Sequence, residues 1–480
     1  MATSSLKKNA FYSVLKAFMN IAFPVITFPY ASRILGPEAM GKVNFSNSVV
    51  SYFLMIAGLG VGGYAVREAA KRHDDKEALS KFVKEILFIN GLSTLISYLV
   101  FICTILLVPK LFPYRSLLII CSLKILFTTL GLDWLYTALE KFRYVTIRSF
   151  CFQILSLIFL FAFVRSDSSV IAYAIFGIIS AVGSNIFNFI HSRKYICYSL
   201  KTDFHPSDHL RSIIVFTGMS FVTSVYTTLD TTMVGILSTD SQVGYYSAAT
   251  KLNHMIVSLL NALTGVLLPR LSQYLKKKEN MKFTELSQKS FSIIMLLSIP
   301  LATGLFLFAK PLVLLFSGDK YIPAVITMQI ITPIIFFIPL ANITGTQILP
   351  ALNKEKISLC SYITGASLNI ICNLLLIPKY GASGAAIGTV IAESTVTLIQ
   401  IIHLRKAVFT KEILFNLFQA VFATSVMAVI LYFYISLTSS IYVQLFGGTL
   451  IGILIYALIL RIIKNKYFIE TVNSMLLKRN

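Results

Sequence analysis

Charged residues are scarce in this 480-residue chain, and their scarcity excludes most soluble architectures. Asp, Glu, Lys and Arg make up 13% of the chain, whereas soluble domains carry about 25%. Hydrophobic residues make up 56% of it, and its mean hydropathy is +0.77. A soluble protein of this composition would have to bury nearly all of its surface, so we expect an integral membrane protein.

Motifs for covalent or metal chemistry are also missing. The sequence contains no GxxxxGK[ST] phosphate loop, no HExxH and no GxSxG, so we expect no enzyme activity, no cofactor and no metal. Its six cysteines form no CxxC pair, which favours buried thiols over disulfides. The first apolar run is long and carries Lys16 and Pro24, so we expect no cleavable signal peptide.

The net charge of +22 does not indicate nucleic-acid binding. The basic residues lie in short clusters between apolar runs, and no basic face with interleaved aromatics is present. If the N-terminus is cytoplasmic, the inside segments hold 31 of the 42 Lys and Arg residues and the outside loops hold seven. This asymmetry follows the positive-inside rule and predicts that both termini are cytoplasmic.

Long apolar runs are what the chain has in abundance. About 20 apolar residues cross a bilayer core as a helix. Fourteen runs qualify, at residues 10–33, 41–64, 86–108, 116–137, 149–164, 170–190, 212–237, 244–268, 291–309, 324–350, 357–377, 384–404, 414–437 and 441–460. The runs are continuous, without the alternation of a membrane β-barrel. The sequence therefore predicts an all-α integral membrane protein with about 14 transmembrane helices.

The sequence also repeats itself. An Ala-Leu-x-Lys match pairs Lys141 with Lys354 at an offset of 213 residues, and a His-x-Arg-Lys match pairs His191 with His403 at an offset of 212. A third match pairs the residues that follow the first run with those that follow the seventh, at an offset of 202. The matches are individually weak, but they occur in order and at similar spacing. They predict an internal duplication of six spans.

An even number of spans gives both repeats the same orientation, so the repeats are expected to be parallel. We expect an N-terminal six-helix lobe at 1–211, a C-terminal six-helix lobe at 212–406, and two additional helices with a cytoplasmic tail at 407–480. Substrates of such bundles commonly pass between the lobes by alternating access.

Ionisable residues inside the spans are the candidate functional residues, since a charge facing lipid is costly. They are Lys16, Lys124, Asp133, Asp230, Lys251 and Glu393. His254 lies one helical turn beyond Lys251 on the same face. The cations would suit an anionic head group in a substrate cavity, and the carboxylates would suit ion coupling. Structural ion pairs, such as Asp230 with Lys251, and snorkelling of Lys16 remain open alternatives.

Two prolines interrupt the first span. Pro24 and Pro29 each remove a backbone hydrogen bond and tend to kink a helix. The kink could serve as a gate or be a static bend.

Three stretches carry a resemblance to a known family. They are NAFYSVLKAFMNIAFPVITFPYASRILGPEAMGKVNFSNS, GLDWLYTALEKFRYVTIRS and DTTMVGILSTDSQVGYYSAATKL. The chain resembles the Wzx or RfbX-type polysaccharide flippases, which transfer O-antigen repeat units and belong to the multidrug/oligosaccharidyl-lipid/polysaccharide exporter superfamily. The resemblance extends over nearly the whole chain.

The resemblance implies MATE-like lobes and a flippase. Its substrate would be an undecaprenyl-diphosphate-linked oligosaccharide, moved from the cytoplasmic to the outer leaflet of the bacterial inner membrane for a surface polysaccharide. A cationic cavity would hold the diphosphate, with Lys16, Lys124 and Lys251 as the matching positions. We expect a monomer that associates with polysaccharide polymerase and chain-length machinery.

Three other functions compete with this interpretation. A cation-coupled drug or metabolite antiporter of the same superfamily would share the fold and use the buried acids. A membrane polymerase or ligase commonly needs a large outside loop, and the longest one expected here covers only residues 310–323. A passive channel agrees poorly with a two-lobed repeat.

Overall fold

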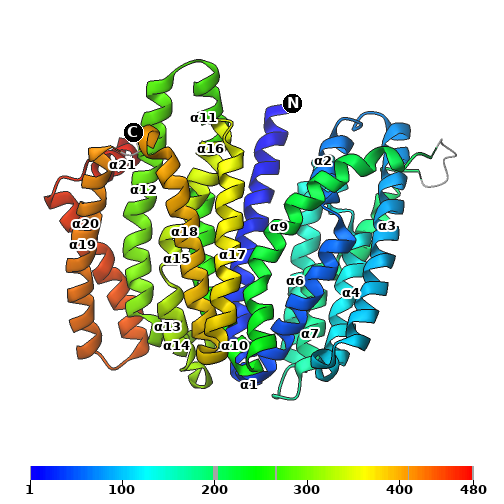
Figure 1. Cartoon of the computed structure of the whole chain (residues 1–480), viewed down its shortest axis with the longest axis horizontal. Coiled ribbons are helices and arrows are strands. Elements are labelled where there is room, and N and C mark those ends of the chain that lie inside the picture. The colour runs from blue at the N-terminus through cyan, green and yellow to red at the C-terminus, as the bar shows by residue number, and fades with distance from the viewer. Residues whose placement is uncertain (1, 198–203, 265–266, 409, 478–480) are drawn as a thin grey trace. The chain divides into compact units, whose positions relative to one another are not determined.

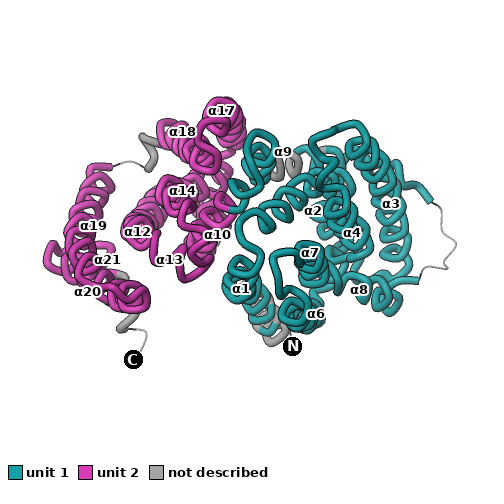
Figure 2. Tube along the Cα trace, turned by 90° about the horizontal axis from the view of Figure 1, so that it is seen from below, with its two compact units in different colours: residues 1–244 teal, residues 245–480 magenta. Residues whose placement is uncertain are grey.

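The computed structural model describes residues 2–197, 204–264, 267–408 and 410–477, and these form helices joined by short connections (Figure 1). No β-strand occurs among these residues. The chain divides into two compact units, Met1–Gly244 and Tyr245–Asn480, which Figure 2 shows in different colours.

The first unit holds nine α-helices and the start of a tenth. They are α1 (Ala2–Gly58), α2 (Val61–Ala70), α3 (Lys76–Leu107), α4 (Arg115–Gly131), α5 (Asp133–Ala138), α6 (Phe142–Phe163), α7 (Val170–Ile178), α8 (Asn185–Ser192), α9 (Ser207–Leu237) and α10 (Asp240–Thr264), with a 3₁₀ turn η1 (Pro109–Tyr114) and a π-helical turn η2 (Ile179–Gly183). The long α1 packs against α3, α4, α6, α7 and α9 and so forms the centre of the unit.

The second unit continues α10 and adds eleven α-helices. They are α11 (Leu267–Lys276), α12 (Asn280–Leu307), α13 (Ala309–Ser317), α14 (Ala324–Ile331), α15 (Ile334–Ala341), α16 (Leu349–Ala351), α17 (Glu355–Tyr380), α18 (Ala382–Val408), α19 (Lys411–Leu437), α20 (Gly448–Ile462) and α21 (Lys466–Leu477), with η3 (Asp319–Tyr321), η4 (Asn342–Ile348) and η5 (Val443–Gly447). Within the unit, α18 packs on α14, α15 and α17, and α12 joins α15 to α19.

Twelve helical stretches of the described residues are long and apolar enough to cross a membrane. The first, at 18–70, includes most of the first expected span and all of the second, and the remaining eleven each coincide with one expected span. The seventh expected span falls on α9, and residues 265–266 of the eighth lie outside the described part. The all-helical membrane fold is confirmed, and a total of about 14 spans is compatible with the structure.

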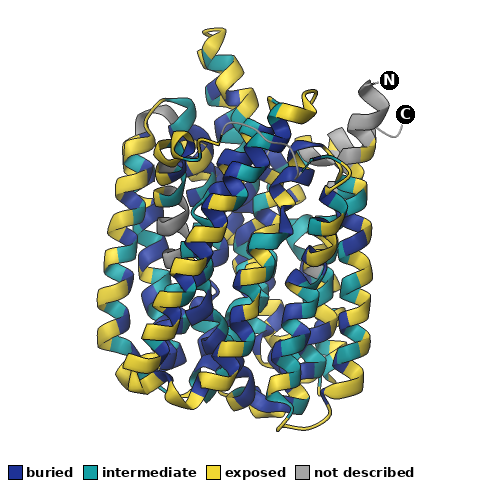
Figure 3. Cartoon of the chain, turned by 90° about the vertical axis from the view of Figure 1, so that its right-hand side faces the viewer, coloured by how far each residue is buried: buried dark blue, intermediate teal, exposed yellow. Residues whose placement is uncertain are grey.

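Burial follows the pattern of a membrane protein. Many large apolar side chains are exposed, among them Leu437 at 85% and Leu107 at 77%. Exposed and buried positions alternate along the helices in Figure 3. Polar side chains such as Asn188, Asn253 and Gln400 are completely buried. Lipid solvates the apolar side chains of a membrane protein, whereas polar side chains tend to lie between helices.

The break in α1 lies at a glycine and not at the expected prolines. Gly36 has φ 75° and ψ 177°, and it is the position with non-helical backbone angles inside α1. A positive φ is readily adopted by glycine because it has no Cβ. Pro24 and Pro29 lie within helical backbone of α1. A gating role of these two prolines stays a prediction.

The duplication is visible in one turn that recurs at the expected offset. Glu140 and Asn353, 213 residues apart, both adopt left-handed backbone with φ of 53° and 56°. The next residue in each repeat, Lys141 or Lys354, donates its N–H to the carbonyl five residues earlier, at 2.9 Å in both cases. A helix then starts directly after each of these lysines. The same Schellman-type ending also occurs at Lys278 and Lys464, so this turn agrees with the repeat without being specific to it. The lobe boundaries at 211 and 406 stay a prediction.

Candidate functional site

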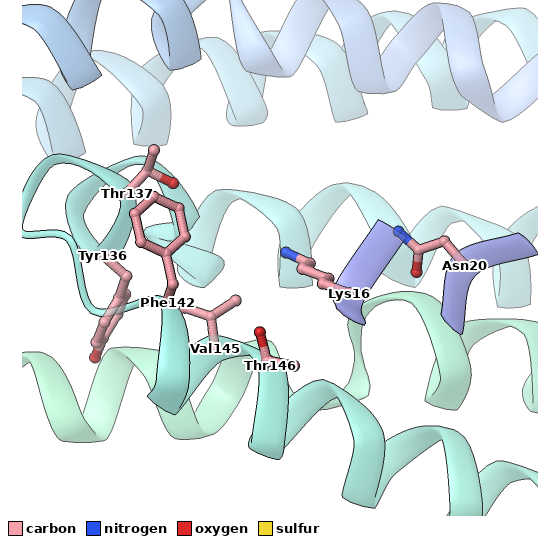
Figure 4. Close-up of a pocket in the computed structure, with 7 residues that line it drawn as sticks. All are labelled: Lys16, Asn20, Tyr136, Thr137, Phe142, Val145 and Thr146. Atoms are coloured by element: carbon pink, nitrogen blue, oxygen red, sulfur yellow. The ribbon is translucent and has the colours of Figure 1, made fainter. Parts of the chain in front are cut away.

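A pocket in the first unit contains one of the predicted lysines. Its volume is about 220 Å³, and it lies between α1 and the α5–α6 corner (Figure 4). It is lined by Lys16, Asn20, Tyr136, Thr137, Phe142, Val145 and Thr146. At about 30 Å³ per water molecule, it has room for roughly seven waters. This is the scale of a small head group, not of a whole oligosaccharide.

Contacts between α1 and α6 hold this pocket in shape. Thr146 donates its hydroxyl to the backbone carbonyl of Tyr12 at 3.1 Å, and Gln153 donates its amide to Asn20 at 3.4 Å. The lining therefore offers hydroxyl and amide groups beside the aromatic rings of Tyr136 and Phe142. Such a mixture suits a ligand with both polar and apolar surface.

The Lys16 amine points from α1 towards the α5–α6 side of the pocket (Figure 4). Lys16 is partly buried. Among the side chains that the structure describes, no carboxylate lies within ion-pair distance of it. Because a charge at membrane depth tends to find a partner or a wet cavity, an amine without a carboxylate favours an anionic ligand.

Lys124 lies deeper in the unit, on α4. Its amine donates to the amide oxygen of Asn47 on α1 at 2.6 Å. A Cβ added to Gly177 on α7 would lie 3.9 Å from the same amine, so α1, α4 and α7 meet around it. An amide oxygen satisfies one donor of the ammonium group but does not neutralise its charge.

Asp133 forms a network at the start of α5. Its Oδ1 accepts from Arg148 Nη2 at 3.2 Å and from Asn188 Nδ2 at 2.8 Å. Tyr136 donates its hydroxyl to the carbonyl of Asn188 at 2.7 Å, and Thr137 donates to the carbonyl of Asp133 at 2.9 Å. Tyr136 and Thr137 also line the Lys16 pocket, so the network adjoins it.

The other predicted residues fall in different parts of the chain. Asp230 is buried on α9 in the first unit, and Lys251 is partly buried on α10 in the second. His254 is exposed on α10. Glu393 is buried on α18, where its carbonyl accepts from Thr397 at 2.8 Å. The pairing of Asp230 with Lys251, and the roles of His254 and Glu393 in binding or ion coupling, stay predictions.

Sequence reasoning missed Arg148, which it counted only as one of the inside basic residues. Arg148 is 9% exposed, and its guanidinium lies 5.9 Å from the ring centre of Tyr144. The signal that could have found it is its position, six residues inside α6 and one turn beyond Val145, which lines the pocket. An arginine there is too far from the helix end to be ordinary loop charge.

It also missed a buried carboxylate–imidazole pair between α3 and α9. Glu85 is 4% exposed and accepts from the backbone N–H of His205 and from His209 Nε2, both at 2.9 Å. Tyr64 bonds to the other ring nitrogen of His209 at 2.7 Å. This cluster fastens the beginning of α9 to α2 and α3. The signal was a lone Glu inside the apolar sequence FVKEILF.

Comparison with known families decides the identity. A family model described as “Polysaccharide biosynthesis protein” matches residues 6–275, more than half of the chain. The chain belongs to the polysaccharide biosynthesis protein family. A second model, MatE, matches residues 216–375 of this family member. The two matches overlap and extend across both compact units.

Curated relatives of this polysaccharide biosynthesis protein carry transporter and flippase names. An Escherichia coli (strain K12) protein named “Putative O-antigen transporter” is 26% identical over 417 residues, which are 84% of this chain and 97% of the relative. A Haloferax volcanii protein named “Probable low-salt glycan biosynthesis flippase Agl15” is 26% identical over 254 residues, 52% of this chain and 54% of the relative.

Solved structures share the fold. A structure described as “Lipid II flippase MurJ, inward closed conformation” superposes with a TM-score of 0.73 at 19% identity and covers 95% of this chain and 98% of its own. An inward-facing multidrug resistance MATE family transporter gives a TM-score of 0.64 at 15% identity, with coverage of 82% and 93%. The expected MATE-like architecture is therefore confirmed.

Proposed function

We propose that the chain is a flippase for lipid-linked oligosaccharides. It moves undecaprenyl-diphosphate-linked repeat units from the cytoplasmic to the outer leaflet by alternating access. The observation that carries the proposal is the Lys16 pocket, in which an amine with no carboxylate partner among the described side chains faces hydroxyl, amide and aromatic groups. The family, and relatives named for O-antigen transport and glycan flipping, support it.

In this proposal, basic residues of each unit bind the diphosphate. Lys16 and Lys124 supply positive charge along α1 and α4, and Lys251 with His254 serve the same purpose on α10. Lysine acts on a phosphate as a mobile point charge and does not require one fixed geometry. Such binding suits a head group that must enter and leave during every cycle.

The setting follows from the same reasoning. The protein lies in the bacterial inner membrane with both termini cytoplasmic, since basic residues concentrate in the segments expected on that side. It acts as a monomer, because two lobes suffice for one path. It works beside a polysaccharide polymerase and chain-length machinery, which receive the repeat units.

The test is depletion of the protein in its host, followed by extraction of undecaprenyl-linked glycans. The proposal expects a complete repeat unit to accumulate in a form that glycan probes cannot reach from outside. Complementation with Lys16→Gln should restore at most about a tenth of the transport, since a lost charge-assisted contact weakens binding about ten- to a hundredfold. Lys8→Gln, which removes an exposed lysine of the same helix, should complement fully.

A cation-coupled antiporter is the second candidate, favoured by the MatE match at residues 216–375 and by the buried Glu393. Depletion without any glycan accumulation, but with altered drug sensitivity, would replace the flippase by this antiporter. Glu393→Gln should then abolish drug efflux that depends on an ion gradient.

A further inference from the structure

Only one of the three nitrogen atoms of the Arg148 guanidinium forms a hydrogen bond within the described structure. Nη2 donates to Asp133, whereas Nε and Nη1 are buried and have no hydrogen-bond partner among the residues that the structure describes. The Oδ1 atom of Asn188, in the same network, is also buried without a partner. A buried cation with unpaired donors destabilises the fold, because its hydrogen bonds offset only part of the free-energy cost of desolvation. Unsatisfied groups of this kind in a folded protein point to a missing ligand or an alternative arrangement.

The second repeat shows that the fold itself does not need these charges. The offset of 213 residues takes Asp133 to Thr346 and Arg148 to Ser361, and the offset of 212 takes Asn188 to Gln400. In the second repeat, Gln400 Nε2 donates to Ser361 Oγ at 2.8 Å, and Thr344, two residues before the position that matches Asp133, donates to Gln400 Oε1 at 2.5 Å.

The hydrogen bonds among Thr344, Ser361 and Gln400 join neutral groups, and Thr346, which matches Asp133, bonds to Asn342 outside them. In the described part of the chain, the side chains of Thr344, Ser361 and Gln400 leave no buried polar atom without a partner. An amide reaching across to a hydroxyl is therefore enough to tie these helices together. The guanidinium and carboxylate of the first repeat are an addition to that arrangement, and they add unsatisfied donors to it.

We propose that Arg148 is a further binding residue for the anionic head group and that Asp133 pairs with it until that head group binds. This inference rests on the proposed function, since the ligand is a phosphate-type oxyanion in the adjoining Lys16 pocket. In the described state Asp133 occupies Nη2. When a phosphate enters, it takes the place of Asp133, so that Arg148 presents its planar fork of donors to the phosphate oxygens.

The surroundings permit this exchange. The Asp133 side chain is 54% exposed, so it can turn outwards into solvent, whereas the Arg148 side chain is 8% exposed and stays in place. Tyr136 and Thr137 line the pocket and donate their hydroxyls to the backbone carbonyls of Asn188 and Asp133, so the pocket wall adjoins both residues of the network. The competing carboxylate also rejects neutral lipids, because only an anion can replace it.

Single variants should change affinity in opposite directions. The full-length protein is placed in nanodiscs of zwitterionic lipid, and geranyl diphosphate binding is measured by equilibrium dialysis. Arg148→Gln should weaken binding about ten- to a hundredfold, as expected for loss of a charge-assisted contact. Asp133→Asn should tighten it several-fold, because the competitor is gone. Arg143→Gln, an exposed arginine on the same helix, should leave the affinity unchanged.

A double variant distinguishes a loss of binding from a loss of folding. Asp133→Thr with Arg148→Ser copies the residues of the second repeat, so it should melt close to the wild type yet bind geranyl diphosphate at least about tenfold more weakly. Trp134, the single tryptophan, follows Asp133 in sequence and is 9% exposed. Its emission should shift on ligand addition in the wild type but not in the double variant.

The outcomes separate the two proposals. Wild-type binding that Lys16→Gln weakens, together with wild-type affinity in Arg148→Gln and in the double variant, overturns the role of Arg148 and leaves the flippase intact. Weaker binding in Asp133→Asn also overturns the exchange, because the pair would then be purely structural. Absence of any diphosphate binding to the wild type would remove both proposals.

Discussion

Replacing Gly41 by alanine should destabilise the first unit. Gly41 lies on α1 against the start of α10, and a Cβ there would come within 1.8 Å of the carbonyl oxygen of Asp240. A reciprocal contact follows one turn later, where a Cβ on Gly244 would lie 2.1 Å from the carbonyl oxygen of Pro37. Backbone thus lies directly on backbone, and no flexible side chain can give way.

The magnitude follows from the displacement that the methyl group requires. Ordinary contact begins near 3.4 Å, so the first turn of α10 must retreat by about 1.6 Å. Overpacking of this kind costs about 1–3 kcal/mol. The Tyr114 hydroxyl donates to Asp240 at 2.6 Å, and losing that bond costs about 1 kcal/mol more. Alanine regains about 0.5–1 kcal/mol of helix propensity, which leaves a net loss of about 1–3 kcal/mol.

Gly91 provides the matched control. It lies in the middle of α3, and a Cβ on it would meet nothing within 4 Å. Gly91→Ala should therefore be neutral or raise stability by about 0.5–1 kcal/mol. The assay is thermal unfolding of the purified protein in detergent, followed by Trp134 fluorescence. For a unit of this size, 1 kcal/mol corresponds to about 2–4 °C in Tm. Equal melting of Gly41→Ala and Gly91→Ala would refute the reasoning.

Three more substitutions test single contacts. Glu85→Ala should lower stability by about 2–5 kcal/mol, because the N–H of His205 and the ring of His209 lose their acceptor in a buried site. Faster proteolysis in the segment before α9 would show this loss, and unchanged cleavage would contradict it. Asn47→Leu should weaken transport with little change in expression, because it leaves Lys124 without its amide acceptor; normal transport would show that this bond is dispensable. Asn465→Ala removes two donated bonds that tie the start of α21 to α19, and should loosen α21 towards added protease by more than tenfold.

Much of the architecture could be predicted from the sequence because membrane helices must be long and apolar. The weak Ala-Leu-x-Lys match also located a real structural element, the left-handed turn at Glu140 and Asn353. The break at Gly36 falls between two expected spans, but its sharpness depends on one positive φ that hydropathy does not encode. The hydropathy pattern and the sequence matches therefore predicted the helical segments and their repetition, but not the angle between neighbouring segments.

Side-chain partners were harder to predict. Lys124 and Asp133 share one apolar run, yet Lys124 bonds to Asn47 on α1 and Asp133 to Arg148 on α6. Such partners are set by how helices from distant parts of the chain pack, and spacing along one helix carries no information about that. For the same reason Arg148 looked like an ordinary basic residue of a cytoplasmic loop, although it is buried against other helices.

The duplication offers an internal control that a single domain lacks. Features present in both repeats, such as the turn before α6 and α17 and the amide at Asn188 or Gln400, are sufficient to build the helix corner. Features present in one repeat alone are not needed for that corner and are open to another explanation. The Asp133–Arg148 pair of the first repeat adjoins the Lys16 pocket, whereas the second repeat has neutral side chains at the matching positions. This difference in charge is therefore better explained by ligand binding than by helix packing. The charges that the first repeat carries at this corner are therefore the ones that the proposed anionic head group would use.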